Sequence, residues 1–137
     1  MRYVGVRQEP KLVLLPGDGK HHRLEGDWHV WHYGKWYTVP DGFVTDGASI
    51  PNFLRPICGD PNKAPRVYAA LMHDWLYHRG GSEADRKLAD RLYRDLQLWY
   101  GIPAYKAHVE YFALRLCGRA HWYNKKKAER YDESESY

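Results

Sequence analysis

The sequence predicts an α+β protein, in which an N-terminal antiparallel β-sheet precedes a C-terminal bundle of three helices. Short β-branched and aromatic runs, separated by turn residues, fill the first half of the chain. Apolar residues at spacings of three and four fill the second half. Strands and helices are therefore segregated and do not alternate along the chain, which is the pattern of α+β proteins.

The predicted strands lie within about residues 2–46, and each is bounded by turn residues. The chain between two aromatic runs contains Gly34 and Lys35, and so short a connection predicts a hairpin. The last run ends at a loop that begins with Asp46. The predicted strands are residues 3–6, 12–15, 28–33, 36–39 and 43–45.

The predicted helices lie within about residues 65–118. Proline suits the first turn of a helix, where its missing N–H is not needed, and glycine commonly follows the last turn. Ser82, with Asp85 three residues later, has the spacing of a capping box. The three helices are predicted to begin near Pro65, Ser82 and Pro103 and to end near Gly80, Gly101 and Gly118.

The 137 residues are enough for one domain, which we expect to cover residues 1–122. Residues 123–137 combine three lysines with an acidic, serine-containing end. Such a segment cannot bury enough apolar surface to order by itself. We therefore expect residues 123–137 to form a polar, disordered tail.

Composition excludes several classes of protein. No run approaches eighteen apolar residues, so we expect no transmembrane segment, and the charged first residues predict no signal peptide. Two isolated cysteines predict neither a disulfide framework nor a zinc finger. Three of the lysines behind the net charge of +4 are residues 125–127, and an acidic end follows them, which disfavours nucleic-acid binding. The 12 Tyr and 6 Trp either fill a small core or line a binding surface.

The densest cluster of reactive side chains is His73, Asp74 and Tyr77 in the first predicted helix. Residues four apart share a helix face, so Tyr77 lies beside His73. The short connection to the next helix makes the two helices antiparallel neighbours and brings Asp90 within reach of His73. A histidine oriented by a buried carboxylate is suited to activating water. The alternative is a core histidine beside a solvated Asp74.

The loop of residues 46–49 supplies a carboxylate, Asp46, and a hydroxyl, Ser49. It leaves the sheet just before the helices, so we expect Asp46 to face the helix that carries His73. The alternative is a turn in which Ser49 caps the following segment.

The chain carries three distinctive segments, at residues 39–51, 69–77 and 89–93. Together they resemble the small bacteriophage and prophage proteins of domain of unknown function 1353. The resemblance spans about residues 37 to 118. It implies a phage product encoded among tail and lysis genes, located in the virion or the host cytoplasm, with other phage proteins or virion components as partners.

Residues 73–77, His-Asp-Trp-Leu-Tyr, also resemble the His-Asp-x-Cys-Tyr signature of phospholipase A2. The resemblance implies a membrane lipid as substrate and calcium as cofactor. Leu76 stands where that family has a disulfide cysteine, and no glycine-rich calcium loop precedes the helix. Only the loop at Asp46 remains to supply further oxygen ligands. The implied roles are His73 as the base, Asp74 as a calcium ligand, Asp90 as the orienting carboxylate and Tyr77 as its hydrogen-bonding neighbour.

Two functions of different class follow. The first is a virion-, tail- or lysis-associated phage protein that cleaves an ester, as a calcium-dependent hydrolase, at the site of His73 and Asp90. The alternative is a non-catalytic phage structural or tail-assembly protein that uses its aromatic sheet as an interaction surface.

Overall fold

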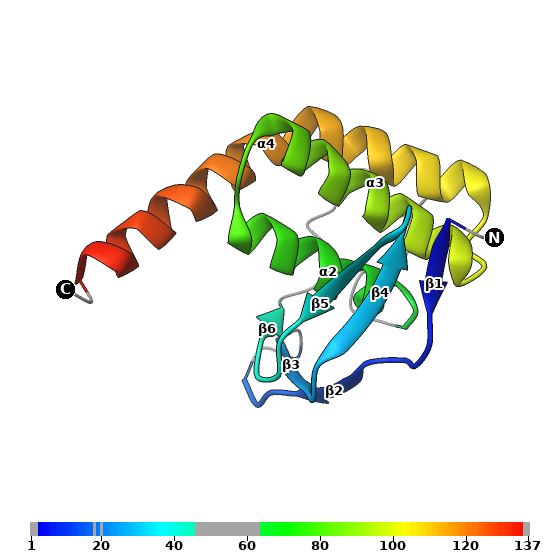
Figure 1. Cartoon of the computed structure of the whole chain (residues 1–137), viewed down its shortest axis with the longest axis horizontal. Coiled ribbons are helices and arrows are strands. Elements are labelled where there is room, and N and C mark those ends of the chain that lie inside the picture. The colour runs from blue at the N-terminus through cyan, green and yellow to red at the C-terminus, as the bar shows by residue number, and fades with distance from the viewer. Residues whose placement is uncertain (1–2, 18, 20, 46–63, 136–137) are drawn as a thin grey trace.

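The computed structural model describes residues 3–17, 19, 21–45 and 64–135. The strands come first and the helices follow, which confirms the predicted α+β class (Figure 1). The strands are β1 (Val4–Val6), β2 (Lys11–Leu14), β3 (His22–Glu25), β4 (Trp28–His32), β5 (Lys35–Val39) and β6 (Val44–Thr45). The helices are α2 (Arg66–Arg79), α3 (Glu83–Trp99) and α4 (Ala104–Glu135).

The strands form two small antiparallel sheets instead of the single predicted sheet, with strand orders β1-β4-β5 and β2-β3-β6. Pairing stops after Val6 meets Val30 and resumes where Lys11 meets Glu25. The chain thus passes from one sheet to the other three times, between β1 and β2, between β3 and β4, and between β5 and β6. Strand β3 was not predicted, because its residues are mostly polar and only one of them, a leucine, is buried.

The predicted hairpin is confirmed as β4 and β5, which pair from Trp28 opposite Val39 to His32 opposite Lys35. The turn residues are Tyr33 and Gly34, one position earlier than the predicted Gly34 and Lys35, because Lys35 already belongs to β5. Both turn residues have positive φ, 47° at Tyr33 and 80° at Gly34. Positive φ at both positions is what a two-residue hairpin turn requires, because the turn must match the twist of its strands.

The core lies between the sheets and the helices. Helix α2 contacts β5, β6 and both other helices, and α3 contacts β1. Helix α4 lies on the side of α2 and α3 that faces away from the strands (Figure 1). Burial of this apolar surface is the main force that holds the two layers together. The least exposed core side chains include Val4, Leu24, Val30, Val39, Leu71, Met72, Leu92 and Leu96.

The start of α3 confirms the predicted capping box. The Asp85 N–H donates to the Ser82 hydroxyl oxygen at 3.2 Å, and the Ser82 N–H donates to the Asp85 carboxylate at 2.8 Å. Two N–H groups at the helix start thereby gain partners. None of the helices in the described part of the chain is long and apolar enough to cross a membrane.

Helix α4 does not end at Gly118, so that prediction is wrong. The helix continues to Glu135 and includes residues 123–135, for which the sequence predicts a disordered tail. A domain boundary at residue 122 stays a prediction. Gly118 is buried, and a Cβ atom there would lie 2.7 Å from the hydroxyl oxygen of Tyr77. This glycine allows close packing against α2 and does not terminate a helix.

Candidate functional site

The structure brings His73, Tyr77 and Asp90 together in the interior. His73 Nε2 lies 2.8 Å from Asp90 Oδ1, and the Tyr77 hydroxyl donates to the same oxygen at 2.6 Å. One helical turn separates the two α2 residues, and their ring centroids are 4.1 Å apart. The packing of α2 against α3 places Asp90 opposite both of them.

Two arginines that the sequence did not indicate bind the other oxygen of Asp90. Arg115 Nη1, from α4, donates to Oδ2 at 2.8 Å, and Arg86 Nη1 lies 3.6 Å from it. Asp90 is fully buried. Its carboxylate therefore contacts side chains from all three helices.

The charge state of the site follows from these contacts. Burial alone would raise the pKa of Asp90, but the hydrogen bond and charge of His73, with the bonds from Tyr77 and Arg115, outweigh burial and lower it. Burial and the adjacent Asp90 charge raise the pKa of Tyr77. At neutral pH the aspartate is thus ionised and the tyrosine is protonated.

The contact at Nε2 determines the protonation pattern of the His73 ring. A neutral His73 donates its Nε2 proton to Asp90 and carries its lone pair on Nδ1. When Nδ1 takes up a proton, the adjacent carboxylate stabilises the imidazolium. His73 can therefore act as a general base that the Asp90 carboxylate orients.

The described residues do not provide the expected calcium site. Asp74 follows His73 on α2 and is buried, and Asp46 and Ser49 lie outside the described residues. Within the described ranges, no three His, Cys, Asp or Glu side chains are grouped to hold a metal ion. Calcium takes six to eight oxygen ligands, so Asp74 alone cannot form a calcium site.

A second histidine–aspartate pair was not predicted. His32 Nε2, on β4, lies 2.8 Å from Asp95 Oδ2, on α3, and both side chains are almost fully buried. Arg94 Nε donates to the other carboxylate oxygen at 3.2 Å. This pair ties the first sheet to the helices. It could not be found from local spacing because 63 residues separate its members.

A third buried contact lies at Glu110 of α4. Arg66 Nε, from α2, lies 3.3 Å from both carboxylate oxygens, and the Tyr93 hydroxyl donates to one of them at 2.9 Å. Burial raises the pKa of Glu110 despite the opposing effect of Arg66. The inner face of α4 is therefore partly charged.

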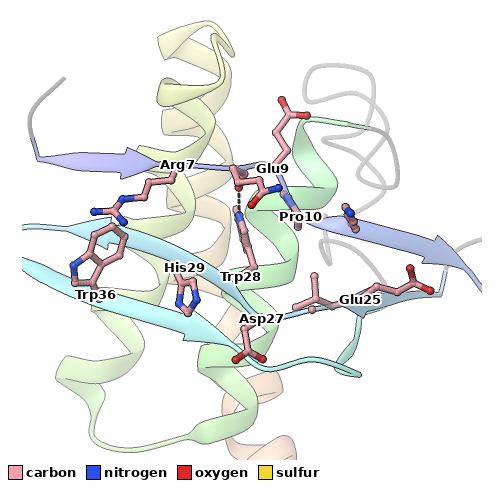
Figure 2. Close-up of a pocket in the computed structure, with 12 residues that line it drawn as sticks. Arg7, Glu9, Pro10, Glu25, Asp27, Trp28, His29 and Trp36 are labelled. Atoms are coloured by element: carbon pink, nitrogen blue, oxygen red, sulfur yellow. Dashed lines mark hydrogen bonds between the residues drawn. The ribbon is translucent and has the colours of Figure 1, made fainter.

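A groove of about 520 Å³ lies between the chain segment that connects β1 to β2 and the segment that connects β3 to β4 (Figure 2). The Trp28 indole N–H donates to the Gln8 carbonyl oxygen at 2.8 Å and joins the two crossing segments. Arg7 lies over the Trp36 ring at 5.0 Å. Figure 2 shows Arg7 and Trp36 together at one end of the groove, and Asp27 and Glu25 toward its other end. Of the aromatic residues, Trp28 and Trp36 line this groove.

Comparison with known proteins gives one family and one relative. Residues 23–114 match the family described as "Protein of unknown function (DUF1353)". The chain is 33% identical over 108 residues to "Uncharacterized protein y4iH" of Sinorhizobium fredii (strain NBRC 101917 / NGR234). That match covers 78% of this chain and 44% of the relative, so the chain spans less than half the length of the relative. No solved structure matches the chain.

Proposed function

We propose that this chain, which belongs to the DUF1353 family of proteins of unknown function, is an ester hydrolase. In this proposal His73 is the general base. The observation that carries the proposal is the contact between His73 Nε2 and the ionised, buried Asp90. That contact directs the basic lone pair to Nδ1. General-base catalysis by such a group contributes typically about 10²- to 10⁴-fold in rate.

The proposed reaction is hydrolysis by direct attack of water. His73 Nδ1 removes a proton as the water oxygen bonds to the ester carbonyl carbon. The tetrahedral intermediate then expels the alkoxide, which takes the proton back from the imidazolium. The products are a carboxylic acid and an alcohol, and His73 returns to its neutral form.

Asp90 and its neighbours are positioning residues in this proposal. The carboxylate orients the imidazole and stabilises its charged form. Tyr77 donates to one oxygen of Asp90 and Arg115 to the other, so the carboxylate keeps its place while the proton moves.

The proposed substrate class is a phospholipid ester. Support comes from the similarity of residues 73–77 to the phospholipase A2 signature, together with an aspartate on the neighbouring helix that contacts the histidine. The roles of Asp74 and Asp46 as calcium ligands belong to the same proposal. We test them by adding or removing calcium.

Hydrolysis by the full chain tests the proposal. Wild type and His73→Ala are incubated with phospholipid vesicles and simple esters, with calcium or with a chelator. We expect a loss of about 10²-fold or more in His73→Ala. The matched control is His32→Gln, which breaks the other buried pair and should retain activity once its fold is verified by circular dichroism. No turnover above the His73→Ala rate on any substrate would contradict the proposal.

The relation between the two residues is tested by a double-mutant comparison. Asp90→Asn alone should also reduce turnover, and combining it with His73→Ala should reduce it no further, since groups that act as a unit are non-additive. Full independence of the two effects would mean that Asp90 does not act through His73.

A second candidate function is a non-catalytic phage structural or tail-assembly protein. The groove at Trp28 and Trp36 favours it, because it adds a concave surface to the aromatic sheet. The pair of His32 and Asp95 also shows that this chain uses such contacts to join its layers. Mass spectrometry of purified particles tests this function, and absence of the protein from particles would count against a virion component.

A further inference from the structure

The groove beside Trp28 has an apolar floor and a polar rim. Leu24 and Trp28 line it and are almost fully buried, whereas Arg7, Asp27 and His29 line it and are exposed. Its volume of about 520 Å³ lies within the range of about 300–1,000 Å³ that ligand sites occupy. Apolar contact surface with a few polar groups is the usual composition of such sites. The groove is therefore built like a binding site.

One end of the groove is positively charged. Arg7 lies there, with its guanidinium carbon 5.0 Å from the centre of the Trp36 ring (Figure 2). Contact with the ring holds the guanidinium in place without neutralising its charge. Among the residues that the structure describes, no carboxylate forms an ion pair with Arg7. This end is therefore able to bind an anionic group of a ligand.

The opposite end of the groove is negatively charged. Glu25 lies there directly across from Lys11 in the pairing of β2 with β3, so these two charges offset each other. The Asp27 carboxylate accepts from the Asp41 N–H through Oδ1 at 2.8 Å, and no described residue binds its Oδ2. Asp27 therefore has one carboxylate oxygen available for a cationic group of a ligand.

The distance between the two ends limits the size of the ligand. Trp36, at the positive end, pairs with Trp31 of β4, and Asp27 precedes Trp31 by four residues. Four residues of strand span about 13 Å at about 3.3 Å each. A free amino acid spans about one residue, roughly 3.6 Å, and cannot reach both ends. An extended peptide of about four residues can reach both.

We propose that the groove binds an extended peptide of about four residues, with a basic side chain at Asp27 and an acidic side chain at Arg7. Each end of the peptide then meets the opposite charge. Gln8 and Glu9, which line the groove, belong to no strand, and the described chain provides no acceptor for their backbone N–H groups. Unpaired backbone of this kind can bond to the backbone of an added peptide. The proposal rests on the groove alone and not on hydrolysis at His73.

Ligands of a single charge fit the groove less well. Nucleic acids are bound mainly through basic residues at their phosphates, and here the phosphates would meet the carboxylates of Glu9, Glu25 and Asp27. A ligand with only positive groups would be repelled by Arg7. A ligand with separated opposite charges satisfies both ends.

Hydrogen bonds hold the rim of the groove in place. The Asp41 carboxylate accepts from the Gly26 N–H at 2.8 Å, while the Asp41 N–H donates to Asp27. His29 Nδ1 lies 2.7 Å from the Thr38 hydroxyl oxygen. A site that is fixed before its ligand arrives loses less conformational entropy on binding.

Titration of the full chain with four tetrapeptides tests the proposal. The peptides are Lys-Ala-Ala-Glu, Lys-Ala-Ala-Lys, Glu-Ala-Ala-Glu and Ala-Ala-Ala-Ala, each acetylated and amidated at its ends. Binding is followed by the NMR signals of the Trp28 and Trp36 indole N–H groups. The mixed-charge peptide should shift these signals and bind most tightly. No saturable shift up to about 10 mM, or equal binding of all four peptides, would overturn the proposal.

Charge variants test the two ends separately. Arg7→Gln and Asp27→Asn should each weaken binding of the mixed-charge peptide about two- to fivefold, the effect of an exposed ion pair. Asparagine keeps the oxygen that accepts from Asp41. Arg7→Glu should change the preference to Lys-Ala-Ala-Lys. The matched control is Lys87→Gln, at an exposed lysine of α3, which should bind like wild type. An equal loss in this control, or an unchanged preference in Arg7→Glu, would overturn the proposal.

Discussion

Replacing Gly118 by alanine tests the packing that surrounds Asp90. The new Cβ would lie 2.7 Å from the Tyr77 hydroxyl oxygen, closer than such atoms approach without movement. That oxygen donates to Asp90 at 2.6 Å, and the Tyr77 ring packs against His73 and Trp122. The tyrosine therefore cannot yield freely, and the strain falls on its hydrogen bond.

Two opposing effects set the magnitude. Alanine is better than glycine in a helix by about 1 kcal/mol. Overpacking a filled interior costs about 1–3 kcal/mol, and a weakened hydrogen bond to a charged group adds up to about 1.5–3 kcal/mol. We expect Gly118→Ala to lower the free energy of unfolding by about 1–3 kcal/mol. At an exposed position in a helix, the same substitution would raise the free energy of unfolding.

Urea denaturation of Gly118→Ala, Tyr77→Phe and the double variant measures the effect. Tyr77→Phe removes the oxygen that the new Cβ would meet. The nearest remaining atoms lie at 3.5 Å on Arg86 and 3.6 Å on the Tyr77 ring, which is ordinary contact. In that background Gly118→Ala should stabilise by about 1 kcal/mol. The coupling between the two changes should therefore be about 2–4 kcal/mol, well above the limit of additivity.

The control is Cys117→Ala, at the exposed residue that precedes Gly118 on the same helix. It should change the free energy of unfolding by less than about 0.5 kcal/mol. The reasoning is refuted if Gly118→Ala stabilises the protein by about 1 kcal/mol in both backgrounds. It is also refuted if the coupling is within about 0.5 kcal/mol of zero.

Two further predictions concern acid stability and the end of α4. The pKa of Asp90 is lowered in the folded state, so its contribution to stability is present above the ordinary carboxyl pKa and is lost as the pH falls through the lowered value. Arg115→Gln removes one cause of that lowering, so urea midpoints measured against pH should show a smaller acid loss that is complete at a higher pH; an unchanged pH dependence would contradict this. Deletion of the residues after Lys125 should change the melting temperature little, whereas a loss of several degrees would mean that the segment packs on the domain, because about 1 kcal/mol shifts a domain of this size by a few degrees.

Part of the candidate site could be predicted from the sequence. The short connection between α2 and α3 makes the two helices antiparallel neighbours, and helical spacing places Tyr77 beside His73. These two facts are sufficient to predict that Asp90 lies close to His73 and Tyr77. The arginines at Asp90 could not be predicted in this way, since Arg115 comes from α4, 25 residues further along the chain.

The sequence by itself determined the α+β class, the β4–β5 hairpin and the capping box at Ser82. Each of these depends on turn residues, caps and periodicities that act over a few neighbouring positions. The sequence did not predict strand β3, because most of its residues are polar. It is held by pairing with β2 and β6 and not by its own pattern.

Only the tertiary structure decided which side of α4 faces inward. Apolar residues recur on two sides of this helix: Ala107 and Leu114 are buried, whereas Phe112 and Leu116 are exposed. The polar Glu110 and the small Gly118 are buried with the first set. Glu110 can lie inside because Arg66, 44 residues away in sequence, supplies its counter-charge. Gly118 lies inside because Tyr77 leaves no room for a Cβ atom. Both reasons are contacts between distant segments, which local spacing does not encode.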